Sequence, residues 1–282
     1  MGNIMKRALA TTLKVLGETG IEHPDAIITG TSLGSLDYTE RFLSAMVENG
    51  EQALSPTYFM QSTHNTVSSA LGIYTKTHGY NITYSHGGQS FDQTILDAWM
   101  QIQLDHINTA LVGGHDEMTT HYFELLRKTG YVGVPGMAPC GEVAMSMLLT
   151  TDKHADNLCE LASISIGTHP NIDMHQVDVI MTGVNGQPAN DALYQQLLAQ
   201  WPKKAHVQYK HLFGENYTAS ALGLYAAAHC LKQGTIPPFM QASPLTPLQQ
   251  ARGTSPITHT LRNILFVNAQ ADSTTYILLK AV

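Results

Sequence analysis

Apolar residues recur along this chain with two different spacings, which together predict an α/β protein. Apolar positions three or four residues apart run through residues 3–19, and Gly20 closes this predicted helix. The next apolar run, residues 25–32, is short and continuous, as expected of a strand buried on both faces. Helix and strand signals continue to alternate toward the end of the chain, so we expect a core built around sheets.

The same pattern predicts the remaining elements. We expect further helices over residues 37–50, with Asp37 as the cap, over most of 57–79, and over 118–129, 189–201 and 218–234. We expect further strands at residues 80–84, 109–117, 142–150, 158–167, 178–186, 206–214, 263–270 and 274–282, the last two as a pair. The proline-rich stretch 237–258 is expected to be an ordered surface loop.

Each half of the chain contains a strand that runs into glycine and then a helix rich in small residues. Such helices permit close backbone approach and are therefore typical of layers between two sheets. We expect two similar halves, residues 1–155 and 156–282, stacked face to face in one compact α-β-α-β-α core.

Composition narrows the classes of function. The net charge of −7 argues against nucleic acid as the main partner, and no apolar run is long enough to span a membrane. The N-terminal residues lack a secretory signal, and the three cysteines lack metal or disulfide spacing, so we expect a cytoplasmic protein. Charged residues make up only 13% of the chain, which suggests either large buried interfaces or an unusually apolar surface, as is typical of oligomers.

The stretch YNITYSHGGQSFDQTILDAW, residues 80–99, reads as a strand, a glycine turn and a helix. Many α/β enzymes hold a nucleophile at such an elbow, but this one contains no cysteine. A hydrolase triad of Ser85, His86 and Asp92 is disfavoured because adjacent strand residues point to opposite faces. His115 and His121 are six residues apart, which does not place two zinc ligands on one helix face. We therefore expect no metal site and no cofactor.

Six segments, in this order and with this spacing, resemble β-ketoacyl synthases of the thiolase-like fold. They are ERFLSAMVENGEQALSPTYFMQSTHNTVSSALGI, the elbow, LVGGHDE with GEVAMSMLL, MTGVNGQPAND, KHLFGENYTASALG and CLKQGTIPP. The resemblance covers nearly the whole chain. It also implies that the usual first strand, which precedes the helix at residues 3–19, is missing.

The departures from this family concern its reactive groups. In family members the elbow carries a cysteine that takes the acyl chain as a thioester, and two histidines stabilise the enolate formed on decarboxylation. The cysteine position falls on Gly88, or on Gln89 if the register slips by one, and the histidine positions fall on Gly183 and Glu215. The resemblance implies that this chain alone does not catalyse condensation.

Two family-like residues are retained, the lysine at Lys210 and the loop aspartate at Asp191. The sequence leaves two interpretations of Glu215 open. It is either a solvated carboxylate after a turn or a buried acid paired with Lys210, five residues earlier. Breaking a truly buried pair would cost about 3–5 kcal/mol.

Synthase-like proteins that keep the fold and lose the cysteine are chain-length factors, and this chain resembles the compact ones of aryl-polyene pathways. That resemblance implies an active ketosynthase as partner, with an acyl carrier protein docking mainly on that partner. We expect the tunnel or interface to involve Tyr58, Phe59, Met60, Gln61, His64, Val67, Asn81, Thr83 and Phe91.

Two other hypotheses remain open from the sequence. One is an active thiolase-fold acyltransferase or decarboxylase that uses Gln89 or Glu215 on a malonyl or acyl carrier protein. The other is a homodimeric acyl-binding or scaffold protein. Turnover without a partner would support the first of these, and a stable homodimer that binds no synthase would support the second.

Overall fold

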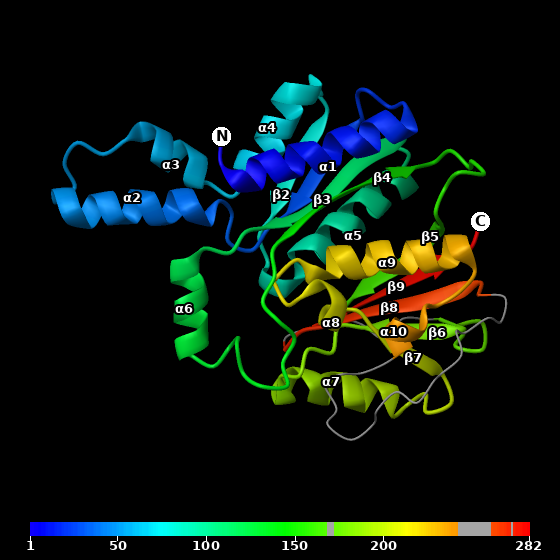
Figure 1. The fold of residues 1–282 in the computed structure, drawn as a ribbon. Helices are drawn as coiled ribbons and strands as arrows, with labels where there is room; N and C mark the ends of the chain where they lie inside the picture. The colour runs from blue at the N-terminus through cyan, green and yellow to red at the C-terminus, as the bar shows by residue number, and fades with distance from the viewer. Residues whose placement is uncertain (168–171, 242–260, 272) are drawn as a thin grey trace. The chain divides into compact units, whose positions relative to one another are not determined.

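The strands of the chain form two mixed sheets, and each sheet is the centre of its own structural unit in the computed structural model (Figure 1). The structure describes residues 1–167, 172–241, 261–271 and 273–282. Unit 1 consists of Met1–Leu125, Gly141–Asp152 and Asn216–Thr218; unit 2 consists of Leu126–Cys140, Lys153–Glu215 and Ala219–Val282. Each unit therefore consists of several separate stretches of the chain, and no single boundary divides the chain into the two units.

Unit 1 is built on a four-stranded sheet with the order β2-β1-β3-β4. Its strands are β1 (Ala26–Gly30), β2 (Tyr80–Tyr84), β3 (Thr109–Asp116) and β4 (Val143–Thr150). Its helices are α1 (Asn3–Thr19), α2 (Leu36–Asn49), α3 (Pro56–Ser62), α4 (Thr66–Thr75), the 3-10 turn η1 (Gly87–Gln89) and α5 (Ser90–Gln103). Helix α6 (Thr120–Lys128) contains residues of both units.

Strands β1, β2 and β3 are parallel, and β4 returns antiparallel to β3. Helices α1 and α4 cover one face of this sheet and α5 covers the other (Figure 1). The first face buries a cluster of apolar side chains, contributed by α1, α4 and the two central strands: Ile4, Met5, Ala8, Leu16, Ile27, Val67, Leu71 and Leu111. The periodic apolar positions of residues 3–19 thus pack directly on the strands that the sequence predicted.

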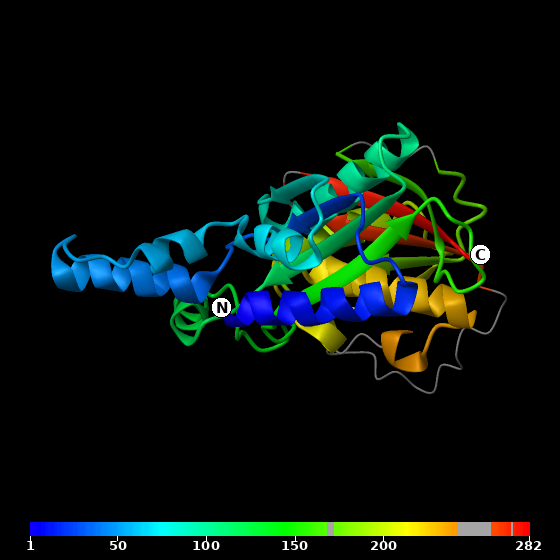
Figure 2. The ribbon, with the colours of Figure 1, turned by 90° about the horizontal axis from the view of Figure 1, so that it is seen from above.

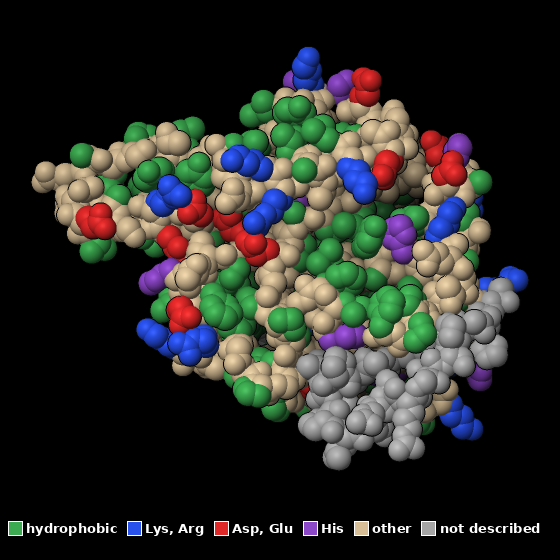
Figure 3. All heavy atoms as spheres, viewed as in Figure 1, with side chains coloured by type: hydrophobic (Ala, Val, Ile, Leu, Met, Phe, Trp, Pro, Cys, Tyr) green, Lys and Arg blue, Asp and Glu red, His purple; other side chains and the backbone are tan. Residues whose placement is uncertain are grey.

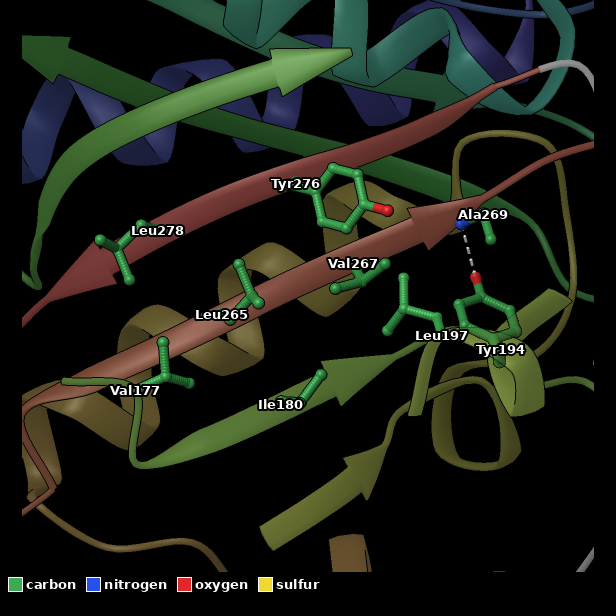
Figure 4. Packing of buried hydrophobic residues seen from close by; sticks show 9 residues of the cluster. All are labelled: Val177, Ile180, Tyr194, Leu197, Leu265, Val267, Ala269, Tyr276 and Leu278. Carbon is green, nitrogen blue, oxygen red and sulfur yellow. Dashed lines mark hydrogen bonds between the residues drawn. The ribbon is translucent and has the colours of Figure 1, made fainter. Parts of the chain in front are cut away.

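Unit 2 contains a five-stranded sheet with the order β5-β9-β8-β6-β7. Its strands are β5 (Glu160–Ile166), β6 (Val179–Thr182), β7 (Ala205–Gln208), β8 (Asn263–Ala269) and β9 (Thr274–Lys280), and its helices are α7 (Pro188–Leu198), α8 (Lys210–Phe213), α9 (Ala219–Gln233) and α10 (Pro238–Gln241). Helix α7 packs on one face, where Tyr194 and Leu197 meet β6, β8 and β9 (Figure 4). The hydroxyl of Tyr194 accepts a hydrogen bond from the backbone N–H of Ala269 at 3.0 Å (Figure 4).

The two sheets repeat one topology. In unit 1, β1 lies between its parallel neighbours β2 and β3, and antiparallel β4 follows β3. In unit 2, β6 lies between parallel β7 and β8, and antiparallel β9 follows β8. Strand β5, which pairs antiparallel with β9, has no counterpart among the described strands of unit 1.

The small residues of α9 serve close packing. Ten of its residues are buried, and most of them are Ala, Ser or Gly. A Cβ atom at Gly223 would lie 2.7 Å from ring atoms of Tyr209 and Phe266, so only glycine admits these two rings. Gly30 likewise permits close packing in unit 1. A Cβ atom on it would lie 2.6 Å from the backbone of Ser90 at the start of α5.

In unit 1, helices α2 and α3 lie side by side and extend away from the sheet (Figures 1 and 2). We call residues 36–62 the arm. Two ring pairs hold it together, Tyr38 with Tyr58 and Phe42 with Phe59, with ring centroids 6.0 and 5.5 Å apart.

Three local predictions need correction. Helix α2 begins at Leu36 with Ser35 at the cap position, so Asp37 lies in the first turn. The helix expected over most of 57–79 is two helices, α3 and α4, interrupted at residues 63–65. The strand expected at 206–214 ends at Gln208, where the backbone turns into α8. The loop expected at 237–258 lies mostly outside the described residues, and only α10 within it is placed.

None of the described helices is both long and apolar enough to cross a bilayer.

Candidate functional site

The elbow of unit 1 keeps the geometry of a nucleophile turn. Gly87 adopts a positive φ of 54°, which favours glycine, and η1 leads directly into α5. The hydroxyl of Ser90 accepts a hydrogen bond from the backbone N–H of His86 at 2.8 Å and donates to the carbonyl of Gly87 at 2.7 Å. Strand, turn and helix are therefore fixed without any reactive side chain.

The side chains that the elbow offers are poorly suited to covalent chemistry. Gly88 has none, and Gln89 is buried, with 4% of its surface exposed. The hydroxyl of Ser85 donates to the carbonyl of Ser32 at 3.1 Å. The cysteines lie elsewhere, and burial raises the pKa of Cys159 to about 12 and that of Cys230 to about 11, so both are thiols at neutral pH.

In unit 2, the space beside Gly183 is already filled. This residue follows β6, and a Cβ atom on it would lie 2.9 Å from the hydroxyl oxygens of both Tyr194 and Tyr209. The same Cβ would lie 3.0 Å from Cε of Lys210. All three neighbours are buried, so a histidine at position 183 would need several core side chains to move.

Glu215 is the carboxylate of a buried cluster. The ammonium of Lys210 donates to its two oxygens at 3.0 and 2.8 Å, and the side-chain amide of Asn185 donates to Oε2 at 2.6 Å. The side chains of Lys210 and Glu215 are 5% and 8% exposed. The structure therefore confirms the buried pair and rules out the solvated carboxylate. A carboxylate that accepts three such hydrogen bonds has its charge balanced by the lysine and its oxygens occupied, which makes it a poor base.

Asp191, which also matches the family pattern, organises the loop after β6. It lies in the first turn of α7 and accepts the backbone N–H groups of Asn185 and Gly186, each at 3.1 Å. Burial raises the pKa of this carboxyl, and the two backbone donors oppose that shift. Gly186 has φ of 85° and approaches the carbonyl of Gly136 so closely that no Cβ would fit.

Two carboxylates missed by the sequence reasoning hold the base of the arm. Asp116 accepts the hydroxyl of Thr31 at 2.8 Å and the backbone N–H of Ser32 at 2.9 Å. Glu117 accepts the backbone N–H of Asp37 at 3.0 Å and the hydroxyl of Ser35 at 3.3 Å, at the start of α2. Burial raises the pKa of both carboxyls. The signal available in the sequence was two adjacent acids at a strand end.

The histidine beside these acids is a core residue. His115 is 1% exposed, and burial lowers its pKa to about 4, so the ring is neutral. The ring lies over Gly113, where a Cβ would come within 2.4 Å of Nε2. His121 is exposed. Across the part of the chain that the structure describes, no three His, Cys, Asp or Glu side chains gather as a metal-ligand group.

The residues predicted to line a tunnel or interface separate into two groups. Phe59 and Met60 on the arm are 57% and 66% exposed, and Tyr58 and Gln61 beside them are half-buried. Hydrophobic and charged side chains alternate over this arm (Figure 3). His64 and Asn81 are exposed, and Thr83 is half-buried and bonded to the hydroxyls of Ser68 and Thr29 at 2.8 and 3.0 Å. Val67 and Phe91, in contrast, are buried in unit 1 and present no side chain to its surface.

Strand β2 is an outer strand of its sheet, and exposed apolar side chains flank it. On α4, Ile73 and Tyr74 are 80% and 57% exposed; on α5, Met100 and Leu104 are 47% and 59% exposed. Tyr80 on the strand itself is 38% exposed. These five residues form what we call the β2 surface. Exposed apolar side chains on both flanks of a strand edge that pairs with no other described strand mark a site of association.

Comparison with known proteins identifies the class of this fold. The ishigamide ketosynthase/chain length factor gives a TM-score of 0.82 at 18% sequence identity, covering 100% of this chain and 83% of that chain. A β-ketoacyl synthase from Burkholderia phymatum STM815 gives 0.83 at 15% identity, with coverages of 100% and 83%. A ketosynthase in complex with its chain length factor from Xenorhabdus doucetiae gives 0.73 at 16% identity, with coverages of 97% and 78%. The chain thus has the thiolase-like fold of ketosynthases.

The sequence gives the family. Residues 1–211 match the model of the β-ketoacyl synthase N-terminal domain, and the chain therefore belongs to the β-ketoacyl synthase family. Among curated proteins, none matches the chain by sequence. The resemblance to this family that the motifs predicted is confirmed.

The buried pair gives a first prediction. Lys210→Met keeps the length of the side chain but leaves the Glu215 carboxylate buried with one donor group, and should lower the free energy of unfolding by about 3–5 kcal/mol. Urea denaturation measures this loss. The double variant Lys210→Met/Glu215→Gln removes both charges and should recover most of it. Equal stability of the single and double variants would contradict the assigned pairing.

The base of the arm gives a second prediction. Because folding raises the pKa of Glu117, its ionisation as the pH rises through that raised pKa destabilises the folded state. Glu117→Gln keeps an acceptor for Asp37 and Ser35 but cannot ionise. Its melting temperature relative to wild type should therefore rise between about pH 5 and about pH 8. Glu48→Gln, an exposed position on the same helix, is the control, and an equal rise there would refute the assignment.

Proposed function

We propose that this chain is a non-catalytic subunit that pairs with an active ketosynthase and shapes the tunnel in which that enzyme's acyl or polyene chain grows. The observation that carries the proposal is the state of the three reactive positions. Gly88 or Gln89 replaces the nucleophile, Gly183 is enclosed by Tyr194, Tyr209 and Lys210, and Glu215 is held in an ion pair.

Decarboxylative condensation needs a thiolate to hold the acyl chain and two hydrogen-bond donors to stabilise the enolate. This chain offers an elbow without a thiol, and in place of the second donor it has a carboxylate, which accepts hydrogen bonds and repels an oxyanion. The cluster around Glu215 also satisfies that carboxylate internally. These replacements favour a subunit that acts through its shape.

The β2 surface supports an obligate partner. Strand β2 pairs with no described strand on its outer side, carries the exposed Tyr80 and has four exposed apolar side chains on its flanks. Open backbone groups and exposed apolar area are both unfavourable in water, and a second sheet would cover both. One of the similar structures is a ketosynthase in complex with its chain length factor, which supports a partner of that class. We assign the partner of this chain as a cysteine-bearing synthase, and we expect the pair to work in the cytoplasm.

The arm supports the tunnel-shaping role. Phe59 and Met60 place bulky, exposed apolar groups on α3, and the ring pairs with α2 hold that helix in position. A rigid apolar wall next to a partner's tunnel would limit the length of the product by its bulk. Since this chain carries a net charge of −7, an acidic carrier protein would dock mainly on the synthase. Compact factors of aryl-polyene pathways are the subfamily we favour.

Pairing is tested on the β2 surface. The double variant Ile73→Glu/Met100→Glu puts charge on both flanks of β2 and should abolish co-purification with the synthase, because a buried unpaired charge is costly. Leu13→Glu on α1 is the control, since Leu13 is also exposed, at 42%. The purified pair should turn over malonyl carrier protein, and this chain alone should not. Turnover by this chain alone, or a covalent acyl adduct on it, would overturn the non-catalytic assignment.

The tunnel-shaping role is tested on the arm. Phe59→Ala and Met60→Ala each remove bulk from α3, so the synthase carrying either variant should release longer products, measured by mass spectrometry. Leu13→Ala should leave the product distribution unchanged. If neither arm variant shifts the distribution while pairing is intact, the arm does not set product length.

A further inference from the structure

A carboxylate lies within the β2 surface. Asp97 on α5 is half-buried, and it precedes Met100 by three residues and Leu104 by seven, so the three side chains share one face of the helix. The hydroxyl of Tyr80 on β2 donates to Oδ2 of Asp97 at 3.0 Å. The charge therefore lies between the strand and the exposed apolar side chains of α5 that we expect a synthase to cover.

Uncharged donors of the same chain orient this carboxylate. The side-chain amide of Gln101 donates to Oδ1 at 3.2 Å, and Nδ1 of His106 in turn bonds to the amide oxygen of Gln101 at 2.9 Å. Tyr84 lies on the same face of β2 as Tyr80, and burial together with the negative charge of Asp97 raises its pKa to about 12. The same two causes raise the pKa of Tyr80. The tyrosines and the glutamine are thus neutral and leave the charge of the carboxylate uncompensated.

The chain provides no cation for this carboxylate. In the part of the chain that the structure describes, no lysine or arginine forms an ion pair with Asp97. The carboxylate of Glu215, which is buried within the chain, is in contrast paired with Lys210. Asp97 is half-buried in the single chain, so water still compensates its charge. A partner that covers the β2 surface removes this water, and a buried charge without a partner is costly.

We propose that the synthase places a lysine or arginine side chain against Asp97 when it covers the β2 surface. The inference rests on the proposed pairing and adds the chemistry that the partner must present, which is one cation within an otherwise apolar contact. A chain with an apolar or acidic residue at that place would leave the carboxylate unpaired, so the contact selects the partner. The apolar flanks provide contact area, and Asp97 provides the discrimination.

The test is the direction in which Asp97→Asn changes the affinity for the synthase. Asparagine keeps an acceptor oxygen for Tyr80 and nearly the same volume, but it carries no charge. The probe is the synthase that co-purifies with the wild-type chain, identified by mass spectrometry and then produced by itself for titration. The variant should weaken pairing by at least about thirtyfold, because the cation of the synthase is left buried without a counter-charge. If Asp97 meets only neutral groups, removal of its charge leaves pairing unchanged or tighter, and that result would overturn the proposal.

A matched control separates the local charge from the net charge of the chain. Glu18→Gln on α1 changes the net charge by the same amount at an exposed position, so its dissociation constant for the synthase should equal that of wild type. A loss there as large as that of Asp97→Asn would mean that long-range attraction, and not a contact at Asp97, accounts for the effect.

Double-mutant cycles identify the residue of the synthase. Each lysine and arginine of the synthase is replaced by methionine in turn, and one replacement should lose most of its effect in the Asp97→Asn background. The absence of coupling to any of them would overturn the proposal.

The Ile73→Glu/Met100→Glu variant distinguishes this inference from the proposed function. If that variant abolishes pairing while Asp97→Asn pairs like wild type, the pairing surface stands and only the cation is wrong. If the double variant also pairs like wild type, or if the chain pairs with no synthase, both proposals fail.

Discussion

The ion pair between Lys210 and Glu215 is almost completely buried, and the geometry around it follows from that burial. A charge in the protein interior is tolerated when its partner and its hydrogen bonds are complete. Here the carboxylate receives both contacts from the lysine and one from Asn185, whose loop is in turn held by Asp191. Each member depends on the others, so the loop after β6 and the turn before α9 are fixed as one cluster.

Packing around Gly183 reinforces this electrostatic cluster. The hydroxyl groups of Tyr194 and Tyr209 and the stem of Lys210 come together over the glycine, and Gly223 on α9 makes room for the Tyr209 ring. Gly183 and Gly223 thus leave the space that the rings of Tyr194 and Tyr209 fill. The surroundings of Gly183 are thus ordinary protein interior, in which volume and charge are both satisfied.

Much of the fold could be predicted from the sequence because its signals are local. Continuous apolar runs gave the buried strands, and helical spacing closed by Gly20 and Gly50 gave α1 and the end of α2. The error at 206–214 arose because β7 and α8 have only four residues each, too few for a strand or helix spacing of apolar residues to show. The break at residues 63–65 carries no glycine or proline to mark it.

The candidate site was predictable to the extent that it depends on motif positions. Aligned motifs located Gly183, Glu215 and Lys210, but the sequence left the state of Glu215 open because pairing depends on three-dimensional burial. The roles of Asp116 and Glu117 were missed because their partners, residues 31–37, lie some eighty positions earlier in the chain. Likewise, Val67 and Phe91 have the residue types of a tunnel wall, and only packing shows that they are core.

The anchoring of the arm at its base has a consequence for how such a subunit diversifies. Asp116 holds the loop before α2, and Glu117 holds the first turn of α2, at the end of β3; neither contact involves the outer residues of the arm. Substitutions farther out on α2 and α3 can therefore accumulate while the sheet keeps its register. Under the proposed tunnel-shaping role, a lineage that needs a different product could change the outer part of the arm alone and keep the rest of the fold unchanged.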